Sequence, residues 1–130
     1  MEERSKKSFG FKELVVWQKA VDFADLIISI TNNLDTKEKH YRLQEQIEAA
    51  AASVACNIAE GKGRNSKKEF IQYLYIARGS LYETITLATV FHKRNWISDD
   101  TYQIIENNSF EIASMIKGLI NSLKKTALSL

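Results

Sequence analysis

The absence of proline from this chain of 130 residues constrains its fold more than any other feature. Proline lacks a backbone N–H and breaks or kinks a helix when it lies inside one. Helices in this chain can therefore be long. The apolar residues also recur at alternating steps of three and four, a spacing that places them on one side of a helix. Together these features predict an all-α protein.

Four apolar seams with this spacing follow one another. The first spans residues 12–32, the second ends near Glu60, and the third and fourth begin after Ser66 and Ser98. Their residues are Leu14, Trp17, Val21, Ala24, Ile28 and Thr31; Leu43, Ile47, Ala50, Val54 and Asn57; Phe70, Leu74, Ala77, Leu81, Thr84, Ala88 and Phe91; and Tyr102, Ile105, Ser109, Ile112, Ile116, Leu119 and Leu123. Four long helices with short connections predict an antiparallel, up-down-up-down four-helix bundle. We expect one domain over residues 1–130, with 1–10 as a loose N-terminal segment.

The predicted helix ends depend on capping residues. Asp35 with Glu38 resembles a capping box that opens the second helix, and Ser66 with Glu69 resembles one that opens the third. Gly61 is predicted to end the second helix as a left-handed cap. The small residues 49–53 predict a second helix surrounded by others, and Cys56 among them is expected to be a buried, inert thiol. Gly79 inside the third helix predicts a close helix contact.

The sequence nominates no catalytic residue, no metal site and no cofactor. A di-iron bundle needs Glu-x-x-His, but Lys37 and Thr89 stand three residues before the two histidines, His40 and His92. No constellation of acid, base and nucleophile can be named, so we expect no enzyme. The single cysteine and the absence of a leader-like or membrane-spanning apolar run predict a cytoplasmic protein that has no membrane partner.

The stretch NIAEGKGRNSKKEF, residues 57–70, carries the strongest signal for binding. Its glycines do not match the spacing of a nucleotide-binding loop. Its positive charges, Lys62, Arg64, Lys67 and Lys68, have no folding explanation, since cations in the first turn of a helix are mildly unfavourable. Two interpretations stay open, a solvated loop or a contact with the phosphate backbone of nucleic acid. In a ring of subunits, the loop would recur around one rim.

A second stripe lies beside the seam of the third helix, one residue further along. It contains Ile71, Tyr75, Arg78 and Tyr82, followed by Ile85 and Thr89. Tyrosine and arginine are enriched where protein surfaces meet, and a bundle helix needs only about three positions in seven for its core. We therefore predict that the stripe is an oligomer interface. The alternative is that it packs on a neighbouring helix or lies half exposed.

Several of these motifs, taken in order, resemble one known family. They are Leu14-x-Val16-Trp17-Gln18-Lys19-Ala20, Gln46, Ser53-Val54-x-x-Asn57-Ile58-Ala59-Glu60-Gly61-x-Gly63-Arg64, Ser66-x-x-Glu69-Phe70, Leu74 and Ala77-Arg78-Gly79-Ser80-Leu81-x-Glu83. The set is similar to the bacterial 23S rRNA intervening-sequence protein family, also called four-helix bundle or S23 ribosomal proteins. That family is related to the accessory variability protein of diversity-generating retroelements.

The resemblance implies a four-helix protomer in a ring-like homopentamer. For the retroelement relative it also implies a basic surface that binds nucleic acid and a partner reverse transcriptase. Asn57, Glu60, Ser80 and Glu83 match the family motif as a polar set. We expect them to form a buried hydrogen-bond network at the corner between the second and third helices.

The chain departs from the family pattern where the second helix has Glu48-Ala49 in place of a frequent Arg-Arg, and it lacks prolines near Asp35 and Ala55. The change at residues 48–49 weakens the case for nucleic acid along this helix. The main hypothesis is a non-enzymatic oligomeric bundle that binds RNA or DNA backbone through a basic rim. The alternative is a protein–protein adaptor or structural oligomer that binds no nucleic acid.

Overall fold

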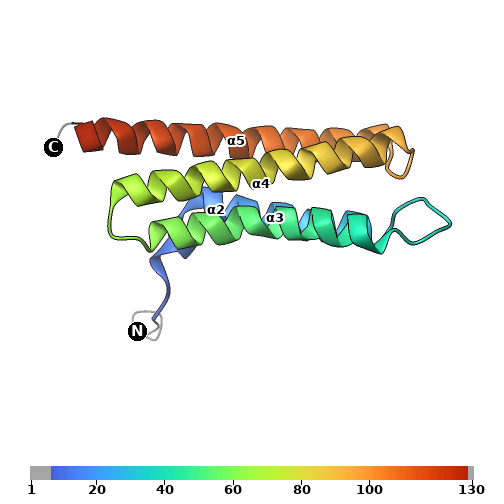
Figure 1. The fold of residues 1–130 in the computed structure, drawn as a ribbon, viewed down its shortest axis with the longest axis horizontal. Helices are drawn as coiled ribbons and strands as arrows, with labels where there is room; N and C mark the ends of the chain where they lie inside the picture. The colour runs from blue at the N-terminus through green and yellow to red at the C-terminus, as the bar shows by residue number, and fades with distance from the viewer. Residues whose placement is uncertain (1–6, 129–130) are drawn as a thin grey trace, which may run out of the picture.

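The computed structural model describes residues 7–128, which contain a short 3-10 helix and four long α-helices and no strand. The elements are η1 Gly10–Glu13, α2 Val15–Thr31, α3 Tyr41–Lys62, α4 Lys67–Lys93 and α5 Asp99–Leu128. Consecutive α-helices run in opposite directions along the long axis of the molecule (Figure 1). The predicted all-α four-helix bundle is confirmed. Most of the segment predicted to be loose, residues 1–10, lies outside the described residues.

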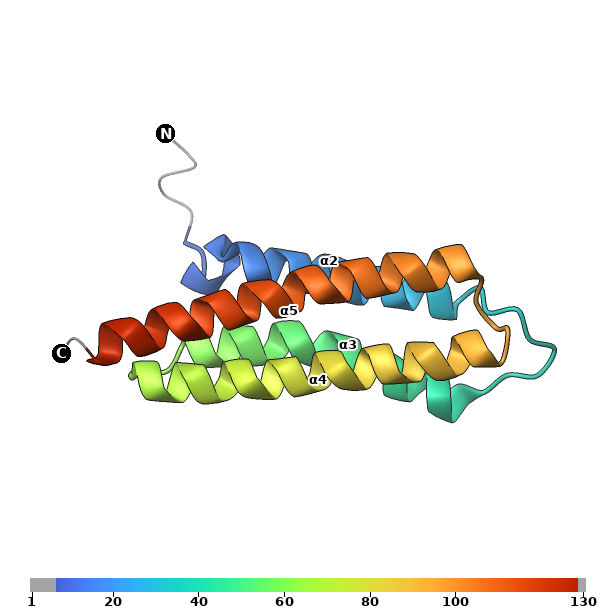
Figure 2. The ribbon, with the colours of Figure 1, turned by 90° about the horizontal axis from the view of Figure 1, so that it is seen from above.

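The four α-helices stand at the corners of a square. Within the described part of the chain, the backbones of α2 and α3, α3 and α4, α4 and α5, and α5 and α2 are neighbours, whereas the two diagonal pairs have no Cα atoms within 8 Å of each other. Seen from above, α2 and α5 lie along one side and α3 and α4 along the other (Figure 2). One end of the bundle therefore gathers η1, the α3–α4 turn and the end of α5. The α2–α3 and α4–α5 connections lie at the opposite end (Figure 1).

The core is built from one stripe on each helix, and α4 buries the seam predicted for it, from Phe70 to Phe91. The stripe of α2 differs from the prediction. Val21 and Ile28 are 38% and 42% exposed, whereas Phe23 and Ile27 are fully buried. Apolar residues lie on several sides of this helix, so their spacing alone does not select the buried side. The larger volume of Phe23 favours its own burial.

The start of α3 was predicted wrongly. Asp35 does not open the helix but lies in the α2–α3 connection, where its backbone N–H donates to the carbonyl of Trp96, 2.9 Å away, in the α4–α5 connection. The helix begins instead at Tyr41, and its N-cap His40 makes no side-chain capping bond. The His40 ring stacks on the Trp96 ring, with 4.2 Å between their centroids. Residues distant in sequence therefore position this connection, which a local capping pattern cannot predict.

Gly61 does not form a left-handed cap, since α3 continues through it to Lys62 and no described glycine has a positive φ. Close packing explains this glycine instead. A Cβ atom at Gly61 would lie 2.6 Å from the Cβ of Tyr73 and 2.9 Å from Cδ1 of Phe70. Gly79 shows the reverse, because a Cβ there would meet no atom within 4 Å apart from its own stretch of helix backbone. The predicted close contact therefore occurs at Gly61 and not at Gly79.

The ends of α4 follow standard capping chemistry. Ser66 Oγ accepts a hydrogen bond from the N–H of Glu69 at 3.1 Å, which confirms the predicted cap. At the other end Asn95 has a φ of 62°, and the N–H of Trp96 donates to the carbonyl of Phe91. The rings of Phe91 and Trp96 pack against each other, with 5.3 Å between their centroids. These bonds and this apolar contact form a Schellman motif, in which asparagine occupies the left-handed position.

One side of α3 is exposed, contrary to the expectation of a fully surrounded helix. Ala50, Ala51 and Val54 face the core, whereas Ala49 and Ala52 lie on the surface. Cys56, predicted to be buried, is also exposed. A helix at the corner of a square bundle contacts only two neighbours, so its outer side stays open.

Candidate nucleic-acid interface

The end of the bundle that carries the α3–α4 turn is strongly basic. The segment around η1, the α3–α4 turn and the end of α5 meet at this end (Figures 1 and 2), and residues 7–13, 60–69 and 124–125 of these segments include eight basic residues and three acidic ones. The basic residues are Lys7, Lys12, Lys62, Arg64, Lys67, Lys68, Lys124 and Lys125, and the acidic residues are Glu13, Glu60 and Glu69. The whole chain has a formal net charge of only +2. Folding therefore concentrates positive charge at one end, which we call the basic end.

Three of the four predicted binding residues are available for an anion. Lys62 and Lys68 are exposed and Lys67 is half-buried in the first turn of α4. None of the ion pairs within residues 7–128 involves these three side chains. Three neighbouring cations around one helix N-terminus can contact adjacent phosphates of a nucleic-acid backbone.

Arg64 has a different role from the three lysines. Its guanidinium lies 2.9 Å from the carboxylate of Glu60 and donates to the hydroxyl oxygen of Tyr73 at 2.5 Å. It also lies over the Tyr73 ring, 4.8 Å from the ring centroid. These contacts attach the α3–α4 turn to α4. Arg64 therefore supports the shape of the turn and is less available to a ligand than the lysines.

The four residues predicted as one polar network make three separate sets of contacts. Asn57 Nδ2 donates to the carbonyl and hydroxyl oxygens of Ser53, and Ser80 Oγ donates to Ser53 Oγ at 3.0 Å. This part joins α3 to α4. Glu60 instead pairs with Arg64, and Glu83 accepts a bond from Gln46 at 3.4 Å on the surface.

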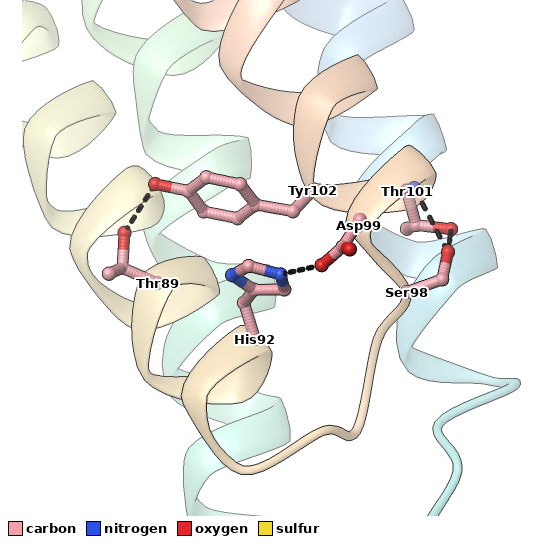
Figure 3. Close-up of polar contacts among 6 residues, drawn as sticks. All are labelled: Thr89, His92, Ser98, Asp99, Thr101 and Tyr102. Atoms are coloured by element: carbon pink, nitrogen blue, oxygen red, sulfur yellow. Dashed lines mark hydrogen bonds and ion pairs between the residues drawn. The ribbon is translucent and has the colours of Figure 1, made fainter.

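The opposite end of the bundle carries a polar cluster that sequence reasoning missed (Figure 3). His92 Nε2 lies 2.6 Å from Asp99 Oδ1, and the His92 ring stacks on Tyr102 with 4.6 Å between centroids. The Tyr102 hydroxyl shares a hydrogen bond with Thr89 at 2.8 Å. The cluster joins the end of α4 to the start of α5. The only sequence signal is a histidine near one helix end and an aspartate opening the next.

A surface hollow of about 580 Å³ lies near this cluster, between the end of α2 and the α4–α5 connection. Its charged lining residues are Asp35 and Asp99, so it does not suit a phosphate. The described residues contain no group of three or more side chains that could hold a metal ion. No helix in the described range is long and apolar enough to cross a membrane.

The second stripe of α4 lies along the groove between α4 and α5. Tyr75 and Tyr82 are 37% and 52% exposed, and the Arg78 guanidinium lies over both rings, 4.8 and 5.7 Å from their centroids. Ile71 instead packs partly against the core. Phe110 of α5, 75% exposed, lines the same groove and was missed because the sequence does not show which side of α5 meets α4. We call Tyr75, Arg78, Tyr82 and Phe110 the aromatic face.

Tyr75 on this face has a perturbed acidity that can be tested. Lys124 Nζ donates to the Tyr75 hydroxyl oxygen at 2.9 Å, and this hydrogen bond holds the pKa of Tyr75 below its ordinary value of about 10. Burial acts in the opposite direction, and the charges of Lys124 and Arg78 lower the pKa further. Lys124→Met should therefore raise the pKa of Tyr75, as measured by NMR titration of labelled tyrosines. Lys125→Met is the matched control, and equal Tyr75 titration in both variants would contradict the assignment.

Comparison with known proteins agrees with this architecture. The family model described as 23S rRNA-intervening sequence protein matches residues 12–118. The crystal structure of a protein of unknown function from the S23 ribosomal protein family of Bacteroides thetaiotaomicron VPI-5482 is 28% identical, with a TM-score of 0.76. The match covers 82% of this chain and 98% of that chain. No curated protein matches. Because the family model spans most of the described bundle, the chain belongs to the 23S rRNA-intervening sequence protein family.

Proposed function

We propose that this protein is a non-enzymatic bundle that assembles with copies of itself and binds the backbone of RNA or DNA through its basic end. The observation that carries the proposal is the gathering of positive charge there, with Lys62, Lys67 and Lys68 outside every ion pair of the described residues. Phosphate contacts of this kind give affinity with little sequence preference. The family's association with a ribosomal RNA insertion supports RNA as the first ligand to test.

The basic end suits an extended polyanion better than a small phosphate ligand. The three lysines extend from the last residue of α3 across the turn to the first residues of α4, and all four predicted cations lie within seven consecutive positions. They line neither the hollow beside the α4–α5 connection nor the groove between α4 and α5. An open arrangement of cations contacts successive phosphates along a strand, whereas a small ligand is bound in a concave site.

The test reverses the three charges together. The variant Lys62→Glu, Lys67→Glu, Lys68→Glu should bind a fluorescent RNA or DNA oligonucleotide about 10- to 100-fold more weakly than the wild type in low salt. Each lost phosphate contact should also lower the dependence of log K on log salt by about 0.7 to 0.9. Fluorescence anisotropy across a potassium chloride series measures both quantities.

The matched control makes the same charge change at the other end of the bundle. Lys37, Lys39 and Lys93 are exposed residues of the α2–α3 connection and the end of α4, so their replacement by glutamate gives the same net charge. This control should lose much less affinity than the first variant. Equal losses would show attraction by net charge alone and would refute a localised site. A wild-type protein that ignores RNA and DNA even in low salt would instead favour a protein–protein adaptor.

A further inference from the structure

The basic end also carries an exposed aromatic side chain, Phe9. This residue directly precedes η1, and its exposed fraction is 69%. The backbone of η1 neighbours both α2 and α3, and the segment lies beside the end of α3 where the α3–α4 turn begins (Figure 1). An exposed phenylalanine therefore lies at the same end of the bundle as Lys62, Lys67 and Lys68.

Two further aromatic rings support the ring of Phe9. The Phe9 and Phe11 rings are stacked, with 5.6 Å between their centroids and 15° between their planes. The Phe11 ring meets that of Trp17 in an edge contact, with 5.3 Å between centroids and 63° between planes. Trp17 in turn packs against the hydrophobic core. We call these three residues the aromatic stack, and it connects the exposed ring of Phe9 to the interior of the bundle.

Hydrogen bonds fix the backbone of the same segment. The N–H of Lys12 donates to the carbonyl of Phe9, and the N–H of Leu14 donates to the carbonyl of Phe11, both at 3.1 Å. The side-chain amide of Gln18 in α2 donates to the carbonyl of Lys12 at 2.7 Å. A ring that is held in place before a ligand arrives loses little conformational entropy when the ligand binds.

One side of the Phe9 ring is open. Within residues 7–128, no ring other than its neighbour in the aromatic stack packs on it, and no cation lies over it. Two tyrosines near this end differ in that respect. The Arg64 guanidinium lies over the Tyr73 ring, 4.8 Å from its centroid, and the Lys124 ammonium lies over the Tyr75 ring at 5.5 Å. Phe9 therefore offers a flat surface on which another ring can stack.

The charges around Phe9 suit a phosphate backbone. Residues 7–13 contain Lys7 and Lys12 against Glu13, and all three side chains are exposed. Lys62 is the last residue of the neighbouring α3. None of these four residues belongs to an ion pair of the described chain, whereas other charged residues nearby are paired with each other, Arg64 with Glu60 and Lys19 with Glu111. Three unpaired cations against one unpaired carboxylate leave a positive surface beside the open ring.

We infer that the basic end binds single-stranded nucleic acid, with one unpaired base stacked on Phe9 and the flanking phosphates on the surrounding lysines. This inference rests on the proposed function and names the form of nucleic acid that the same site binds. Proteins that bind single strands without sequence preference combine cations along the backbone with aromatic rings on which bases stack. In a duplex the bases are already stacked and paired, so their faces are closed to Phe9.

The test separates the contribution of the base from that of the phosphates. A fluorescent oligodeoxythymidine and an abasic strand of the same length carry equal numbers of phosphates, but only the first carries bases. Fluorescence anisotropy measures the binding of each strand to the wild type, Phe9→Ala and Tyr41→Ala. Tyr41, 67% exposed at the start of α3 and therefore at the other end of the bundle, is the matched control for the loss of an exposed ring. Circular dichroism and light scattering compare the fold and the mass of the variants.

Phe9→Ala should bind the thymidine strand about 5- to 100-fold more weakly than the wild type, which is the contribution expected of one stacked base. Its binding of the abasic strand and its salt dependence should stay unchanged, because no phosphate contact is lost. A duplex closed at both ends by base-free linkers should also bind the wild type and Phe9→Ala equally. Phe9→Leu should be as weak as Phe9→Ala, whereas Phe9→Trp should bind tightly, since a flat ring is needed. Tyr41→Ala should behave as the wild type.

Four results would count against the inference, and they separate it from the proposed function. Equal binding of the thymidine and abasic strands by the wild type would overturn it and leave phosphate binding at the basic end in place. A loss by Phe9→Ala on both strands alike would reduce Phe9 to a support of its own segment. A smaller assembly of Phe9→Ala would show that a second copy covers the ring, which also contradicts the inference. A wild type that binds neither strand in low salt would refute the proposed function, and the inference with it.

Discussion

Phe110→Glu, which places a negative charge on the aromatic face and is expected to keep the protein monomeric, should bind nucleic acid at least about 100-fold more weakly than the wild type, although it keeps every cation of the basic end. In a ring, several basic ends lie on one rim and contact the same strand. After the first contact, the others form within one complex, and linked sites of this kind gain about 10²- to 10⁴-fold in affinity. A single protomer offers only a few phosphate contacts and has no such gain. The salt dependence of binding should fall in parallel, because fewer counterions are released.

The experiment compares Phe110→Glu with Ile28→Glu on an oligonucleotide long enough to span several subunits. Both variants exchange an exposed apolar side chain for glutamate, so their net charges are equal and only the assembly differs. On a short oligonucleotide that reaches one subunit, the two variants should bind almost equally. A monomer that binds the long strand as tightly as the ring would show that one basic end is sufficient. That result would separate binding from assembly.

The elements predicted best from the sequence are those whose local apolar and capping pattern is compatible with only one buried side and one helix start. The core seam of α4, from Phe70 to Phe91, and the cap at Ser66 were both predicted correctly. α2 has apolar residues on several sides, and its buried side depends on where Phe23 packs. The start of α3 depends on Trp96, more than fifty residues away, through the contacts of Asp35 and His40. Errors arose where tertiary contacts replaced local ones.

The candidate surfaces also divide into parts formed by residues close in sequence, which could be predicted, and parts formed by several helices, which could not. The cations of residues 62–68 are consecutive in sequence, so their clustering could be predicted, but the addition of Lys124 and Lys125 from α5 required the fold. Tyr75, Arg78 and Tyr82 were recognised as a second stripe because they share one helix. Phe110 could not be assigned to the same surface, because residues of two helices combine there and a single helix pattern does not show which sides meet.

Gly61→Ala is expected to destabilise the protomer by about 2 kcal/mol, whereas Gly79→Ala should stabilise it by about 0.5 to 1 kcal/mol. Both changes add one methyl group inside a helix, and both gain helix propensity. At Gly61 the added Cβ would lie 2.6 Å from the Cβ of Tyr73, so the α3–α4 contact must open against its own packing. At Gly79 the added Cβ would meet nothing within 4 Å. The opposite signs of the two effects therefore depend on the neighbouring atoms and not on glycine itself.

Urea denaturation should be measured in the Phe110→Glu background, because association would otherwise add its own free energy to that of folding. In that background, the midpoint should fall for Gly61→Ala and rise for Gly79→Ala, with unchanged slopes. Gly61→Val should lose more than Gly61→Ala, since its additional methyl groups enter the same contact with Tyr73 and Phe70. If Gly61→Ala were neutral or stabilising, the two helices would have to separate easily at this point. The α3–α4 turn would then be a weakly packed support for the lysines on either side of it.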